Sequence, residues 1–176
     1  MERDFREFKA RVEELGGMLL LRLPEEASQA LPSRGIVMGE GEISGQAFTA
    51  PLEPDGRGGH WLVLENGLAQ LIPGSVVSLR LRPASVWVEP ALPKDLGEAL
   101  MREGLLDAWA ACTVRARWEW IRWMRATGNP LTRQKRVEVA CDKLRKGDRR
   151  PCCFNSSCCT VPQFCKSGIL MEPGSK

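Results

Sequence analysis

The sequence predicts an α+β protein in which a β-rich segment precedes a helical one. Over residues 1–92, short apolar or alternating runs are separated by turns rich in glycine and proline, which is typical of the strands of a small barrel or sandwich. From Pro93 the apolar residues recur at helical spacing, which predicts a helical module over residues 93–147. Residues 148–176 show neither period and hold five of the seven cysteines, so we expect an irregular Cys-rich tail.

Periodicity alone does not decide the structure of the first residues. Phe8, Ala10 and Val12 alternate with charged residues, as in a half-buried strand. The spacing of Phe8, Val12 and Leu15 also fits a helix. The pair Gly16-Gly17 that follows is typical of a hairpin turn, and both interpretations of the preceding segment stay open at this point.

Glycine and proline divide the rest of the β-rich segment into short pieces. We expect further strands over residues 18–23, 36–38, 40–43, 46–50, 60–64 and 75–82. Short helical stretches are expected after Pro24 and over residues 66–71, where the alternation is interrupted.

Four helices are expected after Pro93, over residues 93–103, 105–111, 114–126 and from Thr132 to Gly147. Thr113 and Thr132 are the candidate N-caps of the last two, because a threonine hydroxyl accepts hydrogen bonds from the first backbone amides of a helix. One apolar stripe of the fourth helix contains Val137, Ala140, Cys141 and Leu144. We expect no strand pair after residue 100.

The composition narrows the classes of function. The 176 residues include one histidine and no tyrosine, which excludes a multi-histidine metal site and a tyrosine nucleophile. Residues 1–92 hold 9 Lys/Arg and 13 Asp/Glu, a charge of −4, whereas residues 93–176 hold 16 and 9, a charge of +7. Because the cations of the second half are interleaved with acids, an ordinary solvated surface is favoured over a nucleic-acid interface.

The sequence shows no signal for a membrane. Its longest aliphatic runs contain about four residues, against the roughly 20 needed to span a bilayer, and no apolar leader follows Met1. We therefore expect a cytoplasmic protein with no membrane partner, in which the cysteines are reduced.

Six segments together resemble a known bacterial family. They are Gly41–Phe48, Gly58–Leu62, Pro73–Val77, Val88–Leu96, Trp118–Ile121 and Leu131–Val137. Their order is similar to that in the YdeI/OmpD-associated, bacteriocin-protection proteins, which carry a β-barrel domain of unknown function at the front; Ser75 stands where that family has an acid. Over residues 5–150 the resemblance implies a small split β-barrel followed by a helical module, and it favours a strand over residues 5–13. It implies protection against peptide toxins but no reaction.

The tail contains the most distinctive local motif, a group of cysteines. They are Cys152, Cys153, Cys158, Cys159 and Cys165. Thiolates bind zinc or copper(I), but adjacent cysteines chelate a tetrahedral ion poorly, so we expect no cofactor and keep zinc as the alternative. Redox chemistry is a second alternative, because Arg149 and Arg150 would favour thiolates. A third interpretation, which we favour, is that the tail packs on the helices and that its truncation has little effect.

His60 is the sole candidate for acid–base chemistry near neutral pH. It follows a glycine-rich segment beginning at Arg57, whose backbone could approach an anion. One histidine with unknown neighbours forms no catalytic constellation. We therefore expect no enzyme activity and favour a structural histidine at a strand edge; His60 and Arg57 stay candidate ligand-binding residues.

Three further candidates for ligand binding lie in the helical half. Trp123 falls off the apolar face that contains Trp118 and Ile121, so we expect it to contact solvent or a partner. Arg133 and Arg136 lie in the first turns of the last helix, where cations oppose the helix dipole. Either an acid of the barrel half, which we favour, or an anionic ligand would compensate them.

The function expected from these observations is non-catalytic binding or stress protection, with an anionic small ligand or a protein as the partner. Thiol-based metal binding or redox chemistry in the tail is the alternative. Binding of nucleic acid through the basic half is the third hypothesis, which we do not favour because no signature fold of that class is present.

Overall fold

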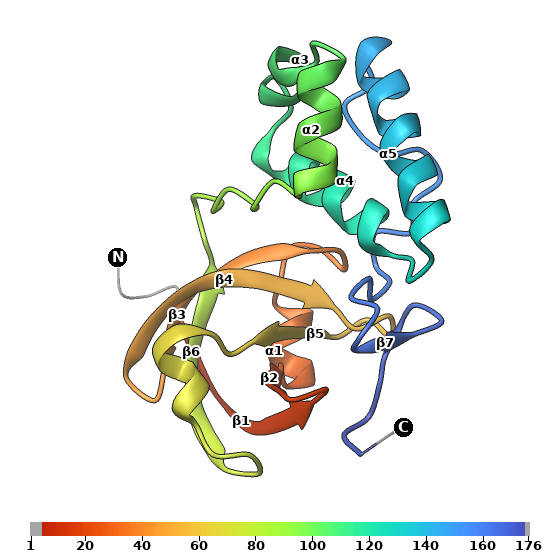
Figure 1. Cartoon of the computed structure of the whole chain (residues 1–176). Coiled ribbons are helices and arrows are strands. Elements are labelled where there is room, and N and C mark those ends of the chain that lie inside the picture. Colours follow the sequence, from red (N-terminus) through yellow and green to blue (C-terminus); the bar gives the residue numbers. More distant parts are fainter. Residues whose placement is uncertain (1–4, 175–176) are drawn as a thin grey trace. The chain divides into compact units, whose positions relative to one another are not determined.

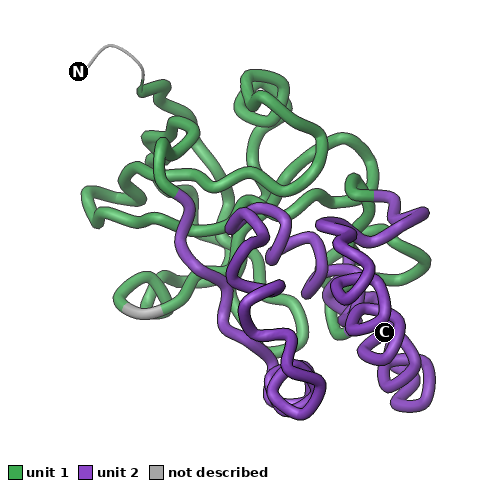
Figure 2. The backbone as a smooth tube through the Cα atoms, turned by 90° about the horizontal axis from the view of Figure 1, so that it is seen from above, with its two compact units in different colours: residues 1–86, 156–159, 163–176 green, residues 87–155, 160–162 purple. Residues whose placement is uncertain are grey.

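The computed structural model describes residues 5–174, except for the side chain of Asn66. The chain forms two compact units (Figure 1, Figure 2). The barrel unit contains residues 1–86, 156–159 and 163–176, and the helical unit contains residues 87–155 and 160–162. The predicted α+β class is confirmed, with strands first and helices second.

Six antiparallel strands close the barrel in the order β1-β2-β5-β4-β3-β6 (Figure 1). They are β1 (Arg6–Leu15), β2 (Met18–Arg22), β3 (Val37–Ile43), β4 (Gln46–Pro54), β5 (His60–Val63) and β6 (Val76–Pro83). Helix α1 (Glu25–Gln29) follows β2, and the 3-10 helix η1 (Asn66–Gln70) follows β5. The two strands expected over residues 36–43 are one continuous strand.

β1 is a strand, as the family resemblance implied, and not a helix. Its first half pairs with β6 and its last four residues pair with β2. Ala10 and Val12 are buried in the barrel core and the charged residues between them face outward, because successive side chains of a strand point to opposite faces. Gly16 and Gly17 then turn the chain with φ values of 58° and 78°, a conformation that favours glycine.

The helical unit has its own apolar core, formed by four helices. They are α2 (Lys94–Arg102), α3 (Leu106–Ala110), α4 (Val114–Arg125) and α5 (Pro130–Arg145). The predicted stripe on α5 is buried in this core, which confirms it: Val137, Ala140, Cys141 and Leu144. The predicted N-cap of α4 is also confirmed, since the Thr113 hydroxyl accepts a hydrogen bond of 3.1 Å from the Ala116 amide.

The prediction that Thr132 caps the last helix is wrong. The side chain of Asn129 is the N-cap of α5 and accepts hydrogen bonds from the backbone amides of Leu131 and Thr132, at 2.9 and 3.1 Å. Pro130 favours this earlier start, because its fixed φ suits the first helical position and it has no amide hydrogen to leave unpaired.

The tail contributes a small hairpin to the barrel unit, so the expectation of no strand pair after residue 100 is also wrong. Strands β7 (Cys165–Lys166) and β8 (Ile169–Leu170) pair across a turn at Ser167-Gly168, where φ is 52° and 79°. The Leu170 amide donates to the Asp55 carbonyl at 2.8 Å, which fixes the hairpin on the β4–β5 turn. Two residues per strand are too few to produce a recognisable period in the sequence.

Aromatic packing anchors this hairpin. The Phe164 ring is 2% exposed and meets Trp61 edge-on, with ring centroids 5.7 Å apart. Gly16 leaves room for the same ring, because a Cβ there would lie 3.1 Å from it. The expectation that the tail packs on the helices therefore fails for residues 163–174, which form part of the barrel unit.

Candidate ligand site in the barrel

The barrel unit contains a cavity of about 720 Å³. Residues of β1 and β6, of the start of α1 and of the β3–β4 hairpin line it: Glu7, Phe8, Lys9, Pro24, Glu26, Glu42, Gly45, Ser78, Leu79 and Arg80. The volume lies within the range of about 300–1,000 Å³ typical of small-molecule sites. Because Glu7 and Lys9 are exposed, the cavity is accessible from solvent.

The apolar part of the cavity comes from two inward-facing side chains. Phe8 of β1 and Leu79 of β6 are direct cross-strand partners, and Leu79 is fully buried while Phe8 is half-buried. Their strands place them together because both alternate between core and solvent. Of the two, the half-buried Phe8 gives a ligand an apolar surface beside the charged rim.

The charged part of the cavity has an excess of acids. Glu7, Glu26 and Glu42 face two cations, Lys9 and Arg80. Arg80 lies opposite Glu42 in the β3–β6 register, with Nη1 3.9 Å from Oε1. Its guanidinium also stacks on the Phe5 ring, 4.6 Å from the centroid. Arg80 is thus already compensated by Glu42. Glu7 lies opposite Arg80 in the β1–β6 register, but within residues 5–174 neither Glu7 nor Glu26 forms an ion pair, so both can receive a cationic group.

His60 and Arg57 lie away from this cavity. The His60 ring is buried, and its Nε2 donates to the Gly35 carbonyl at 2.9 Å, since a carbonyl oxygen only accepts. Within the described residues its Nδ1 has no hydrogen-bond partner. Burial is the largest cause that lowers the pKa of His60. These contacts support the favoured interpretation of His60 as a structural histidine.

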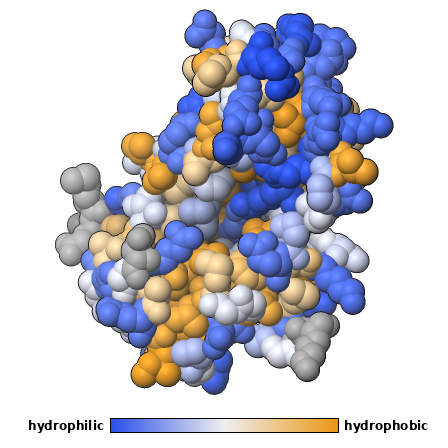
Figure 3. Space-filling view, viewed as in Figure 1, coloured by the Kyte–Doolittle hydropathy of each residue, from blue (hydrophilic) through white to orange (hydrophobic). Residues whose placement is uncertain are grey.

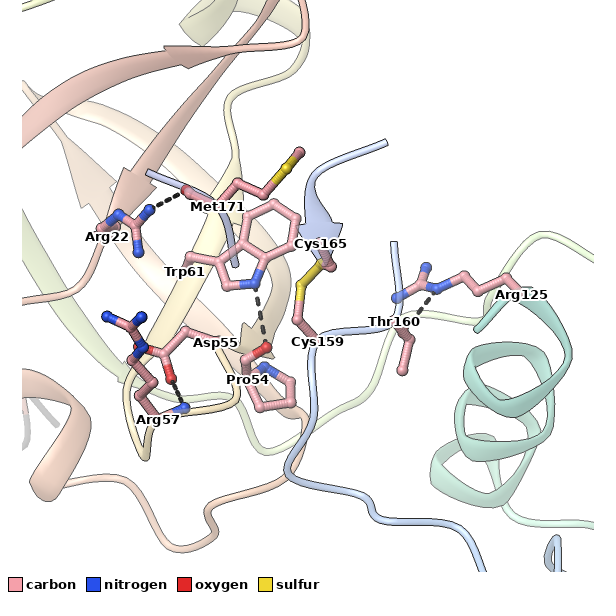
Figure 4. The surroundings of a disulfide bond; sticks show 10 residues. All are labelled: Arg22, Pro54, Asp55, Arg57, Trp61, Arg125, Cys159, Thr160, Cys165 and Met171. Atoms are coloured by element: carbon pink, nitrogen blue, oxygen red, sulfur yellow. Dashed lines mark hydrogen bonds between the residues drawn. A yellow bond between two sulfur atoms is a disulfide. The ribbon is translucent and has the colours of Figure 1, made fainter. Parts of the chain in front are cut away.

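Arg57 is held in the turn between β4 and β5 (Figure 4). Its amide donates to Asp55 Oδ1 at 2.7 Å, and its guanidinium lies 3.7 Å from a Glu172 carboxylate oxygen. Neither contact brings Arg57 to a lining residue of the cavity.

The three candidates of the helical unit contact one another or a neighbouring helix. Arg133 forms a two-point ion pair with Asp95 of α2, with N–O distances of 2.7 and 2.9 Å. This pairing lowers the pKa of Asp95. The expectation that an acid of the barrel half compensates Arg133 is therefore wrong. The acid belongs to α2, because α2 and α5 pack side by side in the helical core. Arg136 stacks on Trp123, 5.4 Å from the ring centroid.

Trp123 is half-buried and packs against the helical core, so its position off the apolar face does not distinguish it from Trp118. Its ring meets Trp120 edge-on at 5.9 Å, and its carbonyl accepts a hydrogen bond from Arg136. Trp118, which we placed in the core, is also half-buried and donates from Nε1 to the Val88 carbonyl at 2.8 Å. An indole N–H that needs an acceptor explains this position at the core's edge.

Many basic side chains of the helical unit pair with acids of the same unit. The pairs include Arg117–Glu89, Arg145–Glu103, Lys143–Asp148 and Lys146–Asp142. The face shown in Figure 3 is strongly hydrophilic over the helices. This pairing compensates many of the basic side chains but leaves their excess over acids in place; the described residues of the unit form no signature fold of a nucleic-acid-binding class.

The tail cysteines divide into differently bonded groups. Cys159 and Cys165 form a disulfide (Figure 4), so the expectation of reduced thiols does not hold for this pair. The reason is geometric: the turn before β7 brings their Cα atoms to 5.8 Å, within the span of a disulfide. Cys152 and Cys153 are exposed, and their sulfurs lie 2.9 Å apart. No group of three or more His, Cys, Asp or Glu side chains within residues 5–174 is arranged to hold a metal ion.

Sequence reasoning missed the cavity because each lining residue looks ordinary in its own strand. The alternation in each strand predicts solvent-facing positions for Glu7, Lys9 and Arg80. Only the pairing of β1 with β6, about 70 residues apart in sequence, brings them together. The one available signal was the density of charges at these positions.

Comparison with protein families assigns both halves of the chain. Residues 89–147 match the family described as Bacteriocin-protection, YdeI or OmpD-Associated, and residues 8–81 match the family described as Domain of unknown function (DUF1905). The chain carries a YdeI/OmpD-associated domain behind a DUF1905 domain. This confirms the resemblance seen in the sequence. No curated protein and no solved structure matches the chain.

The candidate sites fall in different matched domains. Every residue that lines the cavity except Glu7 falls within the DUF1905 domain. Trp123, Arg133 and Arg136 fall within the YdeI/OmpD-associated domain. The tail cysteines lie outside both matches. Within residues 5–174, no helix combines the length and the apolarity that crossing a membrane requires.

Proposed function

We propose that the chain is a non-catalytic binding protein that protects against peptide toxins, and that the barrel cavity accepts part of such a peptide. The observation that carries the proposal is the cavity of about 720 Å³, which combines an apolar surface with charged side chains at its rim. The helical unit of the same chain matches a family whose description includes bacteriocin protection, which supports the choice of a peptide toxin as the ligand.

The charge of the cavity favours a cationic peptide. Three carboxylates face two cations, and one of those cations, Arg80, already contacts Glu42. A basic side chain of the peptide would lie between Glu7 and Glu26, and an apolar neighbour would pack on Phe8. Hydrogen bonds to charged groups contribute about 1.5–3 kcal/mol each, so the carboxylates supply both affinity and selection by charge.

Calorimetric titration with a cationic amphipathic peptide tests this function, with an acidic peptide of the same length as the ligand control. We expect binding of the cationic peptide, weakened by salt, and no binding of the acidic one. The double variant Glu7→Gln/Glu26→Gln should bind roughly tenfold more weakly or worse. Glu14→Gln is the matched control, since Glu14 is an exposed acid of the same strand outside the cavity.

The opposite selectivity would reject the proposal. Binding of the acidic peptide or of inorganic phosphate, lost in Arg80→Gln, would instead assign the cavity to an anionic ligand. Equal affinities of the wild-type chain and the double variant would place the binding surface elsewhere. A sensitivity assay of cells producing each variant gives the matching readout of protection.

A further inference from the structure

Two consecutive cysteines of the helical unit present their thiols on the same side of the chain. The sulfurs of Cys152 and Cys153 lie 2.9 Å apart, and both residues are exposed. Successive side chains of an extended backbone would point in opposite directions. Here the chain turns at Cys153, whose φ is 56°, and the turn brings the two thiols together.

The backbone at Cys153 is unusual for a residue other than glycine. Among the described residues, positive φ values outside glycine also occur at Ser44 and Ser167, and both of these precede a glycine in a hairpin turn. Cys153 is in no hairpin and precedes Phe154. A conformation that costs of order 1–3 kcal/mol persists where its surroundings fix it, so the paired thiols are a defined feature of this loop.

The spacing of the sulfurs favours some ligands over others. With Zn–S bonds of about 2.3 Å, two thiolates on a tetrahedral zinc ion would lie roughly 3.8 Å apart. The observed 2.9 Å is narrower, and no third protein ligand completes a site within residues 5–174. Trivalent arsenic is pyramidal and holds two sulfurs at a smaller angle than tetrahedral zinc does, so this pair would have to open less to bind it. The arsenic also brings its remaining ligand with it.

The charges around the pair favour a neutral ligand over a divalent cation. Arg149 and Arg150 precede the pair closely, and Lys143 is near enough to influence Cys153. The hydrogen bond with Cys152 raises the pKa of Cys153, so its proton is retained at neutral pH. A trivalent arsenic oxide or hydroxide is uncharged at that pH, and these cations would not repel it as they would repel Zn²⁺.

We propose that Cys152 and Cys153 form a dithiol site that chelates a trivalent metalloid, arsenic(III) as its oxide or hydroxide. With an organic arsenic oxide, the two S–H bonds and the As=O bond break and two As–S bonds form. The two protons leave with the oxygen as one water, and no atom changes its oxidation state. The site is separate from the barrel cavity and does not depend on the function proposed for it.

Phenylarsine oxide is the probe for this site, applied to the purified full chain without reductant. We expect one adduct per chain in the intact mass, released by a small dithiol but not by the same concentration of a monothiol. Because the second As–S bond is intramolecular, Cys152→Ser and Cys153→Ser should each bind roughly 100-fold more weakly or worse.

Two control variants separate the pair from the other tail cysteines. Cys158→Ser and the double variant Cys159→Ala/Cys165→Ala should retain the adduct with unchanged affinity. An adduct that survives both single substitutions of the pair, or that disappears in either control, would overturn the assignment. The assignment would also be overturned if the wild-type chain binds no arsenical and its mass shows a disulfide between Cys152 and Cys153. Stoichiometric zinc bound through the two cysteines would overturn it as well.

Discussion

A single residue, His60, should make the stability of the barrel unit depend on pH. It is the only histidine of the chain, and its ring is buried beside Arg34 with one unpartnered nitrogen among the described residues. Burial lowers its pKa in the folded state. Below about pH 6.5 the unfolded chain therefore binds a proton that the folded chain resists. The stability that the neutral ring provides is complete above that pH and is lost as the pH falls toward the folded pKa.

We predict that the free energy of unfolding decreases as the pH is lowered from about 6.5 to 5. In His60→Gln this decrease should be much smaller, because a glutamine amide still donates to the Gly35 carbonyl and does not titrate. Denaturant unfolding at several pH values measures both curves. If the free energy of unfolding falls equally with pH in both proteins, a group other than His60 causes the loss of stability in acid.

At the scale of a single element, the buried stripe of α5 predicts the effect of truncating one side chain. Leu144 is 3% exposed in the helical core. Leu144→Ala should lower the free energy of unfolding by about 2–5 kcal/mol, because it removes apolar contacts and leaves a cavity. Leu131→Ala is the control on the same helix, since Leu131 is 76% exposed, and it should change stability by less than about 0.5 kcal/mol. Similar losses in both variants would contradict this packing.

The start of α5 shows how far element boundaries follow from sequence. Asn129 and Thr132 are both good caps, three residues apart. The sequence pattern does not rank them, and Pro130 settles the choice by adopting the first helical position. In β1, alternation and helical spacing were equally compatible with the residues, and pairing with β2 and β6 decides for the strand.

At the scale of the whole molecule, the tail hairpin completes the barrel unit. Phe164→Ala should lower the free energy of unfolding by about 3–5 kcal/mol, because it uncovers Trp61 and removes a ring that is 2% exposed. Circular dichroism during denaturant unfolding measures this loss. Lys166→Ala, on an exposed position of the same hairpin, should leave stability nearly unchanged. A loss below about 1 kcal/mol for Phe164→Ala would restore the expectation that the tail is dispensable.

Local patterns in the sequence predicted most helices and strands of both units, but not which strands pair with each other over long distances in the sequence. Strand β3 lies between β4 and β6, and the second of these pairings joins residues about 40 positions apart. The cavity depends on the same long-range order, which explains why Glu7, Lys9 and Arg80 did not stand out. Phe164 and Leu170 are single apolar anchors without a period, so their burial was also invisible in the sequence.

The discontinuity of the barrel unit has a consequence for its synthesis. Trp61 leaves the ribosome about 100 residues before Phe164, its partner in the core. At about 5–20 residues per second this interval lasts roughly 5–20 s. All helices of the described chain that follow β6 emerge within that time and have their partners at hand. The helical unit can therefore finish folding first, while the nascent barrel keeps an uncovered aromatic surface, the kind of surface that chaperones bind.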